Sequence, residues 1–384
     1  MRKRFASWIG IALLCVCASA CGGNPVGAAD AQPTVSPAIA DTDALPSARP
    51  RTPAPETPAQ ETPVPEPADS LTTGRLLTTG RRHSPVLVVI ANEPQVRPQM
   101  GLMQADILYE FALDRGAQTT RLVALFSDEY PALAGPVSEA RIYFFDLRRE
   151  YNAMMAYWGY PDEAGYPAFD ESVIDIPAAY GPDLRYLFKR DTTVSSVPEQ
   201  TLFCRVDELA AALYGTMGPG NAERFTFASG AQNPNGKAFT RVGLPFNGKD
   251  TTGIEFVYDE TDNLLYRYER NSKGTLVQSK TLTASADGMR LTSEPVRVQN
   301  LIVQHIKYTP FSERYYNAEL VGKGECDFFI NGQYCQGHWR RDAIDGTTSY
   351  FLRDGNPLTL EPGTTWIAFN GVQRAIKVYY PKAK

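Results

Sequence analysis

Four charged residues lie inside or beside apolar segments, where a side chain either takes part in chemistry or closes an ion pair. Glu110 interrupts ILYEFAL, Asp106 precedes that segment, Arg121 opens RLVALF and Arg141 follows a Gly-Pro pair. Two carboxylates in an open cleft can hydrolyse a glycoside, and arginine binds acidic groups through paired hydrogen bonds. The alternative is structural. Glu110 would then form an ion pair with Arg121, or Asp106 one with Arg141, at the edge of a sheet.

Aromatic residues gather in the segment YWGYPD, which contains Tyr157, Trp158 and Tyr160. Such rings could form a platform on which a sugar stacks. They could equally be core and loop aromatics. Trp158 joins the four charged residues as a candidate ligand-binding residue.

An apolar N-terminal segment ends in a cysteine with its own chemistry. Residues 1–20 begin with Met-Arg-Lys-Arg and continue with an apolar stretch too short to span a bilayer, which is typical of an export signal. Ala18-Ser19-Ala20-Cys21 resembles a bacterial lipobox, in which the Cys21 thiol is acylated and becomes the new N-terminus. The alternative is ordinary secretion after an Ala-x-Ala site. Acyl chains on Cys21 would anchor the protein to a membrane at its extracytoplasmic face.

Residues 21–82 predict a disordered tether. Their segment PSARPRTPAPETPAQETPVPEP is rich in Pro, Thr, Ala and Glu and has no aromatic residue, so it cannot bury enough apolar surface to offset the entropy of ordering. The Pro-x-x-Pro spacings favour a plain linker over a recognition motif. A tether of this length would let the folded part stand off from a bilayer.

Charge and motif content limit the partners. Without its three N-terminal basic residues the chain carries 35 basic and 43 acidic residues, a net charge of −8 with neutral histidine. An acidic chain is repelled by phosphate, so nucleic acid is not an expected partner. The histidines have no zinc-site spacing, and Walker and dinucleotide glycine patterns are absent. We therefore expect no metal and no cofactor.

The remaining chain divides by composition into residues 83–224 and residues 225–384. The first segment predicts an α/β sheet domain, because continuous apolar runs are typical of strands that are buried on both faces. Its expected strands are 86–91, 107–113, 122–126 and 154–158, and its expected helices are 139–152 and 207–214. The second segment predicts a smaller β-rich domain with strands within 254–270, 300–308 and 326–335. The expected fold class is thus a mixed α/β and α+β arrangement.

Residues 326–335, CDFFINGQYC, predict a hairpin whose turn is Asn331-Gly332. A two-residue turn places Phe328 opposite Cys335 and leaves Cys326 on a diagonal, at a distance longer than most disulfides accept. A bulge would bring the two sulfurs together. The sequence therefore does not decide whether Cys326 and Cys335 form a disulfide.

A family resemblance covers about residues 83 to 380. The motifs that carry it, in order, are RPQMGLMQADILYE, TTRLVALF, GPVSEARIYFFDL, NLIVQ, GKGECDFFINGQYCQGHWRRD and LEPGTTWIAF. The chain resembles the YerB-like lipoproteins of Gram-positive bacteria. Because that family is a domain of unknown function, the resemblance implies a two-part extracytoplasmic domain behind a lipidated cysteine, and no reaction. Ser138 replaces a basic residue of the family pattern, and Pro198-Glu199-Gln200 replaces Pro-His-Asn, so no role of that arginine or histidine carries over.

Three functions fit these observations. The favoured hypothesis is a non-catalytic, lipid-anchored protein whose first segment binds a cell-wall polymer or an envelope protein. The second is a hydrolase of cell-wall glycan that uses Asp106 and Glu110. The third is an assembly factor whose role is placement alone.

Overall fold

The computed structural model describes residues 68–77, 85–113, 120–159, 175–177, 185–193, 195–213, 225–231, 233, 235–246, 253–271 and 273–382. All of them belong to one compact unit, Thr62–Lys384. The predicted export signal, Cys21 and most of the predicted tether lie outside the described residues. Within the described part, no helix has the length and apolar character that crossing a membrane requires.

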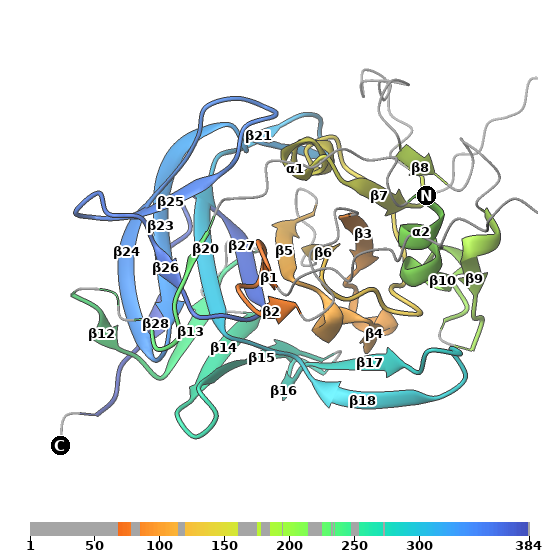
Figure 1. Cartoon of the computed structure of the whole chain (residues 1–384), viewed down its shortest axis with the longest axis horizontal. Helices are drawn as coiled ribbons and strands as arrows, with labels where there is room; N and C mark the ends of the chain where they lie inside the picture. The colour runs from red at the N-terminus through yellow and green to blue at the C-terminus, as the bar shows by residue number, and fades with distance from the viewer. Residues whose placement is uncertain are drawn as a thin grey trace, which may run out of the picture. The chain divides into compact units, whose positions relative to one another are not determined.

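A mixed sheet forms the centre of the unit, and Figure 1 shows its strands side by side. The strand order is β12-β24-β23-β20-β27-β5-β6-β3-β7-β8, and β25 pairs with β24. Strands β20, β27, β5, β3, β7 and β8 run in one direction. The bounds are β3 Val86–Ala91, β5 Ile107–Ala112, β6 Thr120–Phe126, β7 Met154–Tyr157, β8 Asp175–Pro177, β12 Lys237–Ala238, β20 Asn300–Ile306, β23 Gly322–Ile330, β24 Gln333–Arg341, β25 Ser349–Leu352 and β27 Thr365–Gly371.

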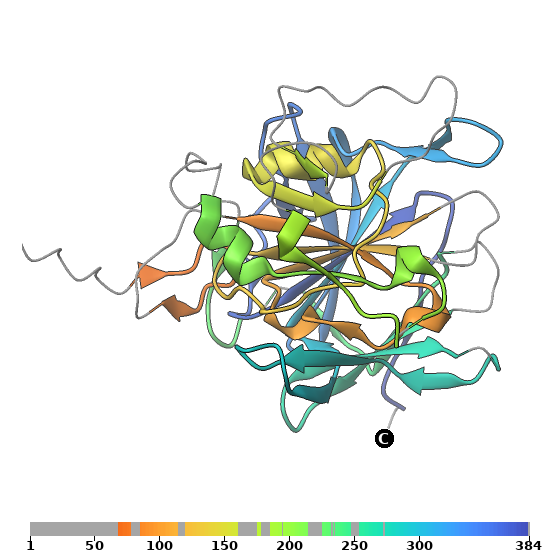
Figure 2. The same ribbon diagram turned by 90° about the vertical axis from the view of Figure 1, so that its right-hand side faces the viewer.

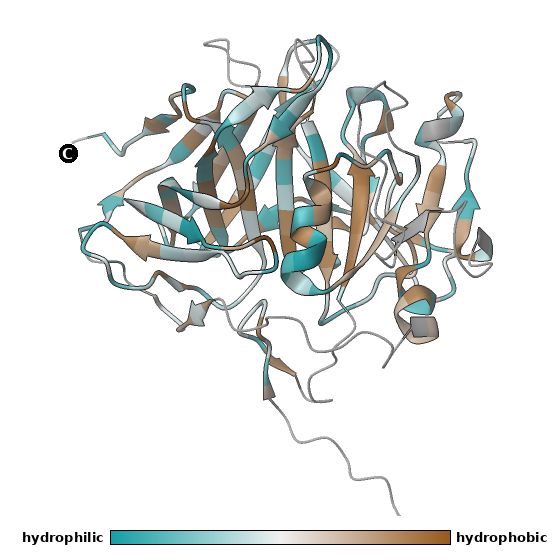
Figure 3. Ribbon diagram, turned by 90° about the horizontal axis from the view of Figure 1, so that it is seen from above, coloured by the Kyte–Doolittle hydropathy of each residue, from teal (hydrophilic) through white to brown (hydrophobic). Residues whose placement is uncertain are grey.

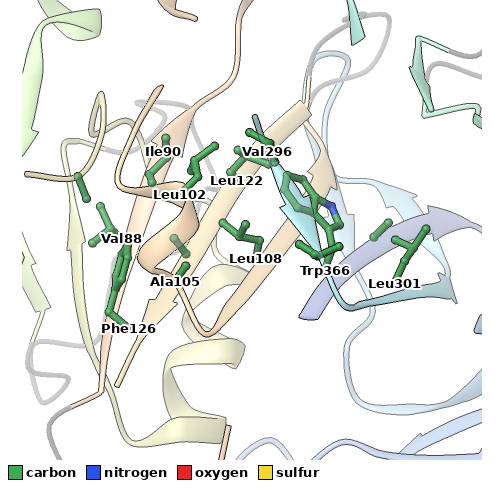
Figure 4. Packing of buried hydrophobic residues seen from close by; sticks show 14 of the residues in the cluster. Val88, Ile90, Leu102, Ala105, Leu108, Leu122, Phe126, Val296, Leu301 and Trp366 are labelled. Atoms are coloured by element: carbon green, nitrogen blue, oxygen red, sulfur yellow. The ribbon is translucent and has the colours of Figure 1, made fainter. Parts of the chain in front are cut away.

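Two apolar cores cover the two faces of this sheet. Alternate side chains of β3 enter different cores, Val88 and Ile90 on one face and Leu87 and Val89 on the other. Figure 4 shows the first core, in which Trp366 lies among side chains from both segments of the sequence. Each fully buried aliphatic side chain contributes roughly 1.5–3 kcal/mol. The continuous apolar run of β3 therefore reflects burial on both sides.

Different elements pack on the two faces, as Figure 2 shows. Helix α1 (Phe144–Tyr151) contributes to the core on one face, and a second sheet of order β16-β15-β14-β13-β28, with β19, contributes to the other. Along β15, which is covered on one side, buried and half-buried residues alternate, and Figure 3 shows the hydropathy of the strands. The bounds are β13 Arg241–Leu244, β14 Ile254–Asp259, β15 Leu264–Arg270, β16 Leu276–Gln278, β19 Arg297–Val298 and β28 Lys377–Tyr379.

The smaller elements complete the unit. Strands β17 and β18 form a ribbon that pairs with β4, and β9 pairs with β10. Further short pairs are β1 with β2, β11 with β26 and β21 with β22. The bounds are β1 Ala68–Asp69, β2 Leu76–Leu77, β4 Gln99–Met100, β9 Phe188–Arg190, β10 Leu202–Cys204, α2 Val206–Leu213, β11 Thr226–Phe227, β17 Lys280–Ala284, β18 Leu291–Pro295, β21 Tyr308–Pro310, β22 Tyr316–Ala318 and β26 Thr359–Leu360. Four 3-10 turns are η1 Pro94–Val96, η2 Leu102–Gln104, η3 Arg185–Leu187 and η4 Pro198–Gln200.

The predicted mixed α/β fold class is wrong, because the structure is dominated by strands. The described residues contain two α-helices of eight residues each. Strands β5, β6 and β3 are antiparallel neighbours, and antiparallel strands need no helical crossover. The helix expected from residue 139 begins only at Phe144, because residues 136–140 are extended and bond to the sheet.

The two sequence segments meet inside the central sheet. Strand β27 of the second segment pairs with β5 of the first along five residues. The end of the predicted tether also belongs to the fold. Residues 68–77 form a two-stranded hairpin in which Ser70, Thr72 and Thr73 are buried, which corrects the tether boundary at residue 82.

The Asn331-Gly332 hairpin has the predicted register. Phe328 lies opposite Cys335, and Cys326 lies opposite Gly337. Both turn residues have positive φ, 49° for Asn331 and 69° for Gly332, as this turn type requires. The structure contains no bond between the two cysteines, and both are buried free thiols.

Candidate functional site

The candidate site begins where two parallel strands separate. Strands β3 and β7 pair only over Val86–Val88, and residues 136–140 then enter between them. The Ser138 amide donates to the Val89 carbonyl at 2.9 Å, and the Trp158 amide donates to the Ser138 carbonyl at 2.9 Å. Sheets with parallel strands bind ligands at their carboxyl ends, where neighbouring strands diverge. The segment 136–140 therefore brings Ser138 and Arg141 to the edge where β3 and β7 end.

Arg121 lies at this edge on the side of α1. Its ladder partner on β5 is Phe111, which belongs to the α1-side core, so both side chains emerge on that face. The Arg121 guanidinium donates to the Ser138 hydroxyl and to Glu93 Oε1, the latter at 3.1 Å. Its side chain is 5% exposed. Arg121 is thus a buried cation whose carboxylate partner, Glu93, is more accessible than itself.

Arg141 is also buried and bound. Its Nη1 lies 3.2 Å from Glu139 Oε2 and 3.1 Å from the Ala140 carbonyl oxygen. Its guanidinium lies 5.1 Å from the ring centre of Tyr315, and the guanidinium of Arg314 lies at the same distance from that ring. A tyrosine from the β21–β22 connection therefore covers Arg141.

Trp158 is the half-exposed member of the site. Its ring meets Phe188 edge-on at 6.2 Å, and the guanidinium of the exposed Arg190 lies 5.1 Å from its centre. Arg190 is held by a hydrogen bond of 3.1 Å to Thr201 Oγ1. A sugar can stack on such an aromatic ring, and the neighbouring cation can bind an anionic group. Tyr160 lies outside the described residues.

Glu110 leaves this site and enters a buried ionic network on the opposite face. Its carboxylate accepts hydrogen bonds from Arg267 at 2.9 Å, Trp366 at 3.1 Å and Thr120 at 2.6 Å. Arg267 also lies 2.6 Å from Glu269 Oε2. Burial alone would lower the pKa of Arg267, but the two carboxylates raise it above its ordinary value.

The ion pair predicted between Glu110 and Arg121 is wrong, because the register opposes Glu110 to Leu122. Arg121 is one residue away on its strand, so its side chain emerges on the other face of the sheet. The predicted pair of Asp106 and Arg141 is not found either, because Asp106 bonds to Thr72 while Arg141 lies 3.2 Å from Glu139.

Asp106 lies at the opposite end of β5 from Glu110. Its carboxylate accepts a hydrogen bond from Thr72 Oγ1 at 2.6 Å, and Asp128 nearby accepts one from Ser70 Oγ at 2.8 Å. Burial, together with the Asp128 charge, raises the pKa of Asp106 well above its usual range. Asp106 therefore fastens the 68–77 hairpin to the sheet. Because Asp106 and Glu110 are buried at different ends of one strand, they do not form the carboxylate pair of a glycosidase.

The sequence analysis missed Arg267, Glu93 and Arg190. A signal for Arg267 exists in LLYRYER, because strict alternation places Leu265, Arg267 and Glu269 on the same, buried face. Charged residues at inward positions of an alternating strand indicate a buried ion pair. No comparable pattern marks Glu93 or Arg190. The part of the chain that the structure describes contains no group of three or more His, Cys, Asp or Glu that could hold a metal ion.

Two family models match the chain, one in each of the two segments into which its composition divides it. Residues 72–217 match the DUF3048 N-terminal domain and residues 242–367 match the DUF3048 C-terminal domain, and the family is described as protein of unknown function. A Bacillus subtilis (strain 168) protein named "Putative lipoprotein YerB" is 27% identical over 310 residues, which cover 78% of this chain and 84% of that protein. The crystal structure of YerB from Bacillus subtilis matches with a TM-score of 0.62 and 23% identity. The match covers 81% of this chain and 99% of that one, and it shows a shared fold.

Proposed function

The chain belongs to the DUF3048 family, and from that premise we propose that it is a lipid-anchored protein of the extracytoplasmic face that binds an anionic envelope polymer without catalysing a reaction. The lipobox at Cys21 supports the anchor, and so does the lipoprotein name of its Bacillus subtilis relative. Acylation at Cys21 would hold the protein at the membrane. The folded unit would then reach into the envelope on the segment before residue 68.

The observation that carries the binding proposal is the edge cluster, which we define as Arg121, Ser138, Arg141, Trp158 and Arg190. Ser138 links its members, because its hydroxyl bonds to Arg121 and its carbonyl to the Trp158 amide. The guanidinium groups of Arg121 and Arg141 and the Arg190–Trp158 pair thus belong to segments that meet at the end of β3, in a chain of negative net charge. Glu93 and Glu139 compensate the charges of Arg121 and Arg141, so Arg190 beside Trp158 supplies the accessible cationic contact.

The catalytic alternative loses its support, because its two acids are neither together nor accessible. Both Asp106 and Glu110 are buried and hydrogen-bonded. Release of reducing sugar from purified peptidoglycan by the full-length protein would revive that alternative, and we expect none.

Binding is tested by sedimentation of the full-length protein with purified cell-wall sacculi, with and without their anionic polymers. Because Arg190 is exposed and stacks on Trp158, we expect Arg190→Ala and Trp158→Ala each to weaken binding about fivefold, and removal of the anionic polymers to abolish it. Arg340→Ala is the matched control, since Arg340 is an exposed arginine on β24, several strands away. Equal binding by all variants, or no binding at all, would overturn the proposal. Loss of palmitate labelling in Cys21→Ser tests the anchor separately.

A further inference from the structure

A pocket lies on the outer edge of β24, away from the edge cluster in the strand order. It has a volume of about 200 Å³. Two short strands cover this edge incompletely, because β12 pairs with Gln333 and Tyr334 while β25 pairs with Gly337 to Arg340. Cys335 and Gln336 lie in the gap between them. The pocket is lined by Asn235, Lys237, Tyr334, Cys335, Gln336, Leu352, Arg353 and Asp354.

The backbone of Gln336 faces this gap. The Leu352 amide donates to the Asn356 carbonyl at 2.8 Å, so the backbone groups of Leu352 point away from β24. The backbone groups of the neighbouring residue, Phe351, therefore point toward its ladder partner His338. Gln336 is two residues before His338, and backbone direction repeats every two residues along a strand. The amide and carbonyl of Gln336 therefore point out of the sheet, and no backbone partner for them exists among the described residues.

The side chains around the gap are held in place. Arg353 Nη2 donates to Gln336 Oε1 at 2.5 Å, and Gln336 Nε2 donates to Asp327 Oδ1 at 2.9 Å. The Tyr334 hydroxyl donates to the same oxygen of Asp327 at 2.8 Å. Ordered side chains lose little entropy when a ligand binds.

The charges at the gap favour an anion. Lys237 and Arg353 are exposed and lie on its two sides. The one carboxylate in the lining, Asp354, accepts two hydrogen bonds from Asn356 at 3.0 and 2.9 Å, so it is engaged within its own turn. An incoming carboxylate would thus meet two cations.

We propose that this gap binds the carboxylate-bearing end of an extended peptide. One residue of the peptide pairs with the Gln336 backbone as an added strand, and the terminal carboxylate contacts Lys237 and Arg353. Two residues of a strand span roughly 7 Å, so the gap admits only the end of a peptide. This site is independent of the edge cluster and of the polymer proposed to bind there.

The proposal is tested with a fluorescein-labelled tetra-alanine peptide that has a free terminal carboxylate, and with the same peptide as its terminal amide. Both are titrated into the full-length protein and followed by fluorescence anisotropy. We expect the acid to bind at least tenfold tighter than the amide, because the charge-assisted contacts need the carboxylate. Lys237→Ala and Arg353→Ala should each weaken binding of the acid at least fivefold, with unchanged melting temperatures.

The matched control is Arg340→Ala, which removes an exposed arginine from the same strand outside the gap and should leave binding unchanged. Arg190→Ala should also leave binding unchanged, which separates this site from the edge cluster. The proposal is overturned if the acid does not bind, if acid and amide bind equally, or if the Lys237 and Arg353 variants bind like the control.

Discussion

The buried network around Arg267 makes a sharp prediction about stability. Arg267→Met removes a guanidinium that is 3% exposed and lies between the carboxylates of Glu110 and Glu269. Glu269 retains Arg97 at 3.2 Å, whereas Glu110 retains only neutral donors. Removing one partner of a buried ion pair costs about 3–5 kcal/mol, because the remaining charge is desolvated without compensation. We expect the free energy of unfolding to fall by that amount, a large part of a typical total.

Urea denaturation of the full-length protein, followed by tryptophan fluorescence, measures this loss, since Trp366 contacts both members of the pair. In the Arg267→Met background, Glu110→Gln should restore part of the stability because it removes the stranded charge. Arg340→Ala should not change the midpoint, since Arg340 pairs only at the surface. A loss below about 1 kcal/mol for Arg267→Met, or no rescue by Glu110→Gln, would refute the reasoning.

Three further predictions concern single side chains. Burial and the Asp128 charge raise the pKa of Asp106 in the folded state, so its stabilising contribution is complete below its unfolded pKa and is lost as the pH rises through the folded pKa. Asp106→Asn should therefore gain stability relative to wild type between pH 4 and pH 8 in urea titrations. A difference in unfolding free energy that stays constant over this range would contradict this. Burial raises the pKa of Cys335 to about 12, so maleimide at pH 8 should modify it only after unfolding, as mass spectrometry of the labelled chain would report. Gly332→Ala should destabilise by about 1–3 kcal/mol, because φ is +69° and an added Cβ would lie 2.7 Å from the Tyr258 ring; an unchanged urea midpoint would argue against this.

Local patterns predicted the local elements. The run VLVVIA predicts β3 at residues 86–91, where the structure has it. A short, fully apolar run is typical of a strand buried on both faces, because a loop would expose some of its residues to solvent. The hairpin at Asn331-Gly332 and its register followed from turn chemistry alone, since both residues adopt positive φ readily. The helix expected from residue 139 began five residues late, because hydrogen bonds to β3 and β7 keep residues 136–140 extended.

The structure separates residues that the sequence analysis grouped as one candidate ligand-binding set. Ser138 joins Arg121 to the Trp158 backbone, and Arg141 follows on the same segment. Glu110, by contrast, faces the core opposite to Arg121, and Asp106 lies at the other end of β5. Their positions depend on strand order and direction, which the spacing of charges along the chain does not encode. Alternation fixes only which residues of one strand share a face.

By itself, the sequence determined the apolar strands, the turn at Asn331-Gly332 and the presence of charges that had to be buried and compensated. Only the tertiary structure decided the partners: Arg267 for Glu110, Thr72 for Asp106 and Glu139 for Arg141. The physical reason is the separation along the chain over which each interaction acts. Backbone propensity and periodicity act within a few residues, whereas an ion pair such as Glu110 with Arg267 joins residues 157 positions apart and exists only once β5 and β15 have packed against each other.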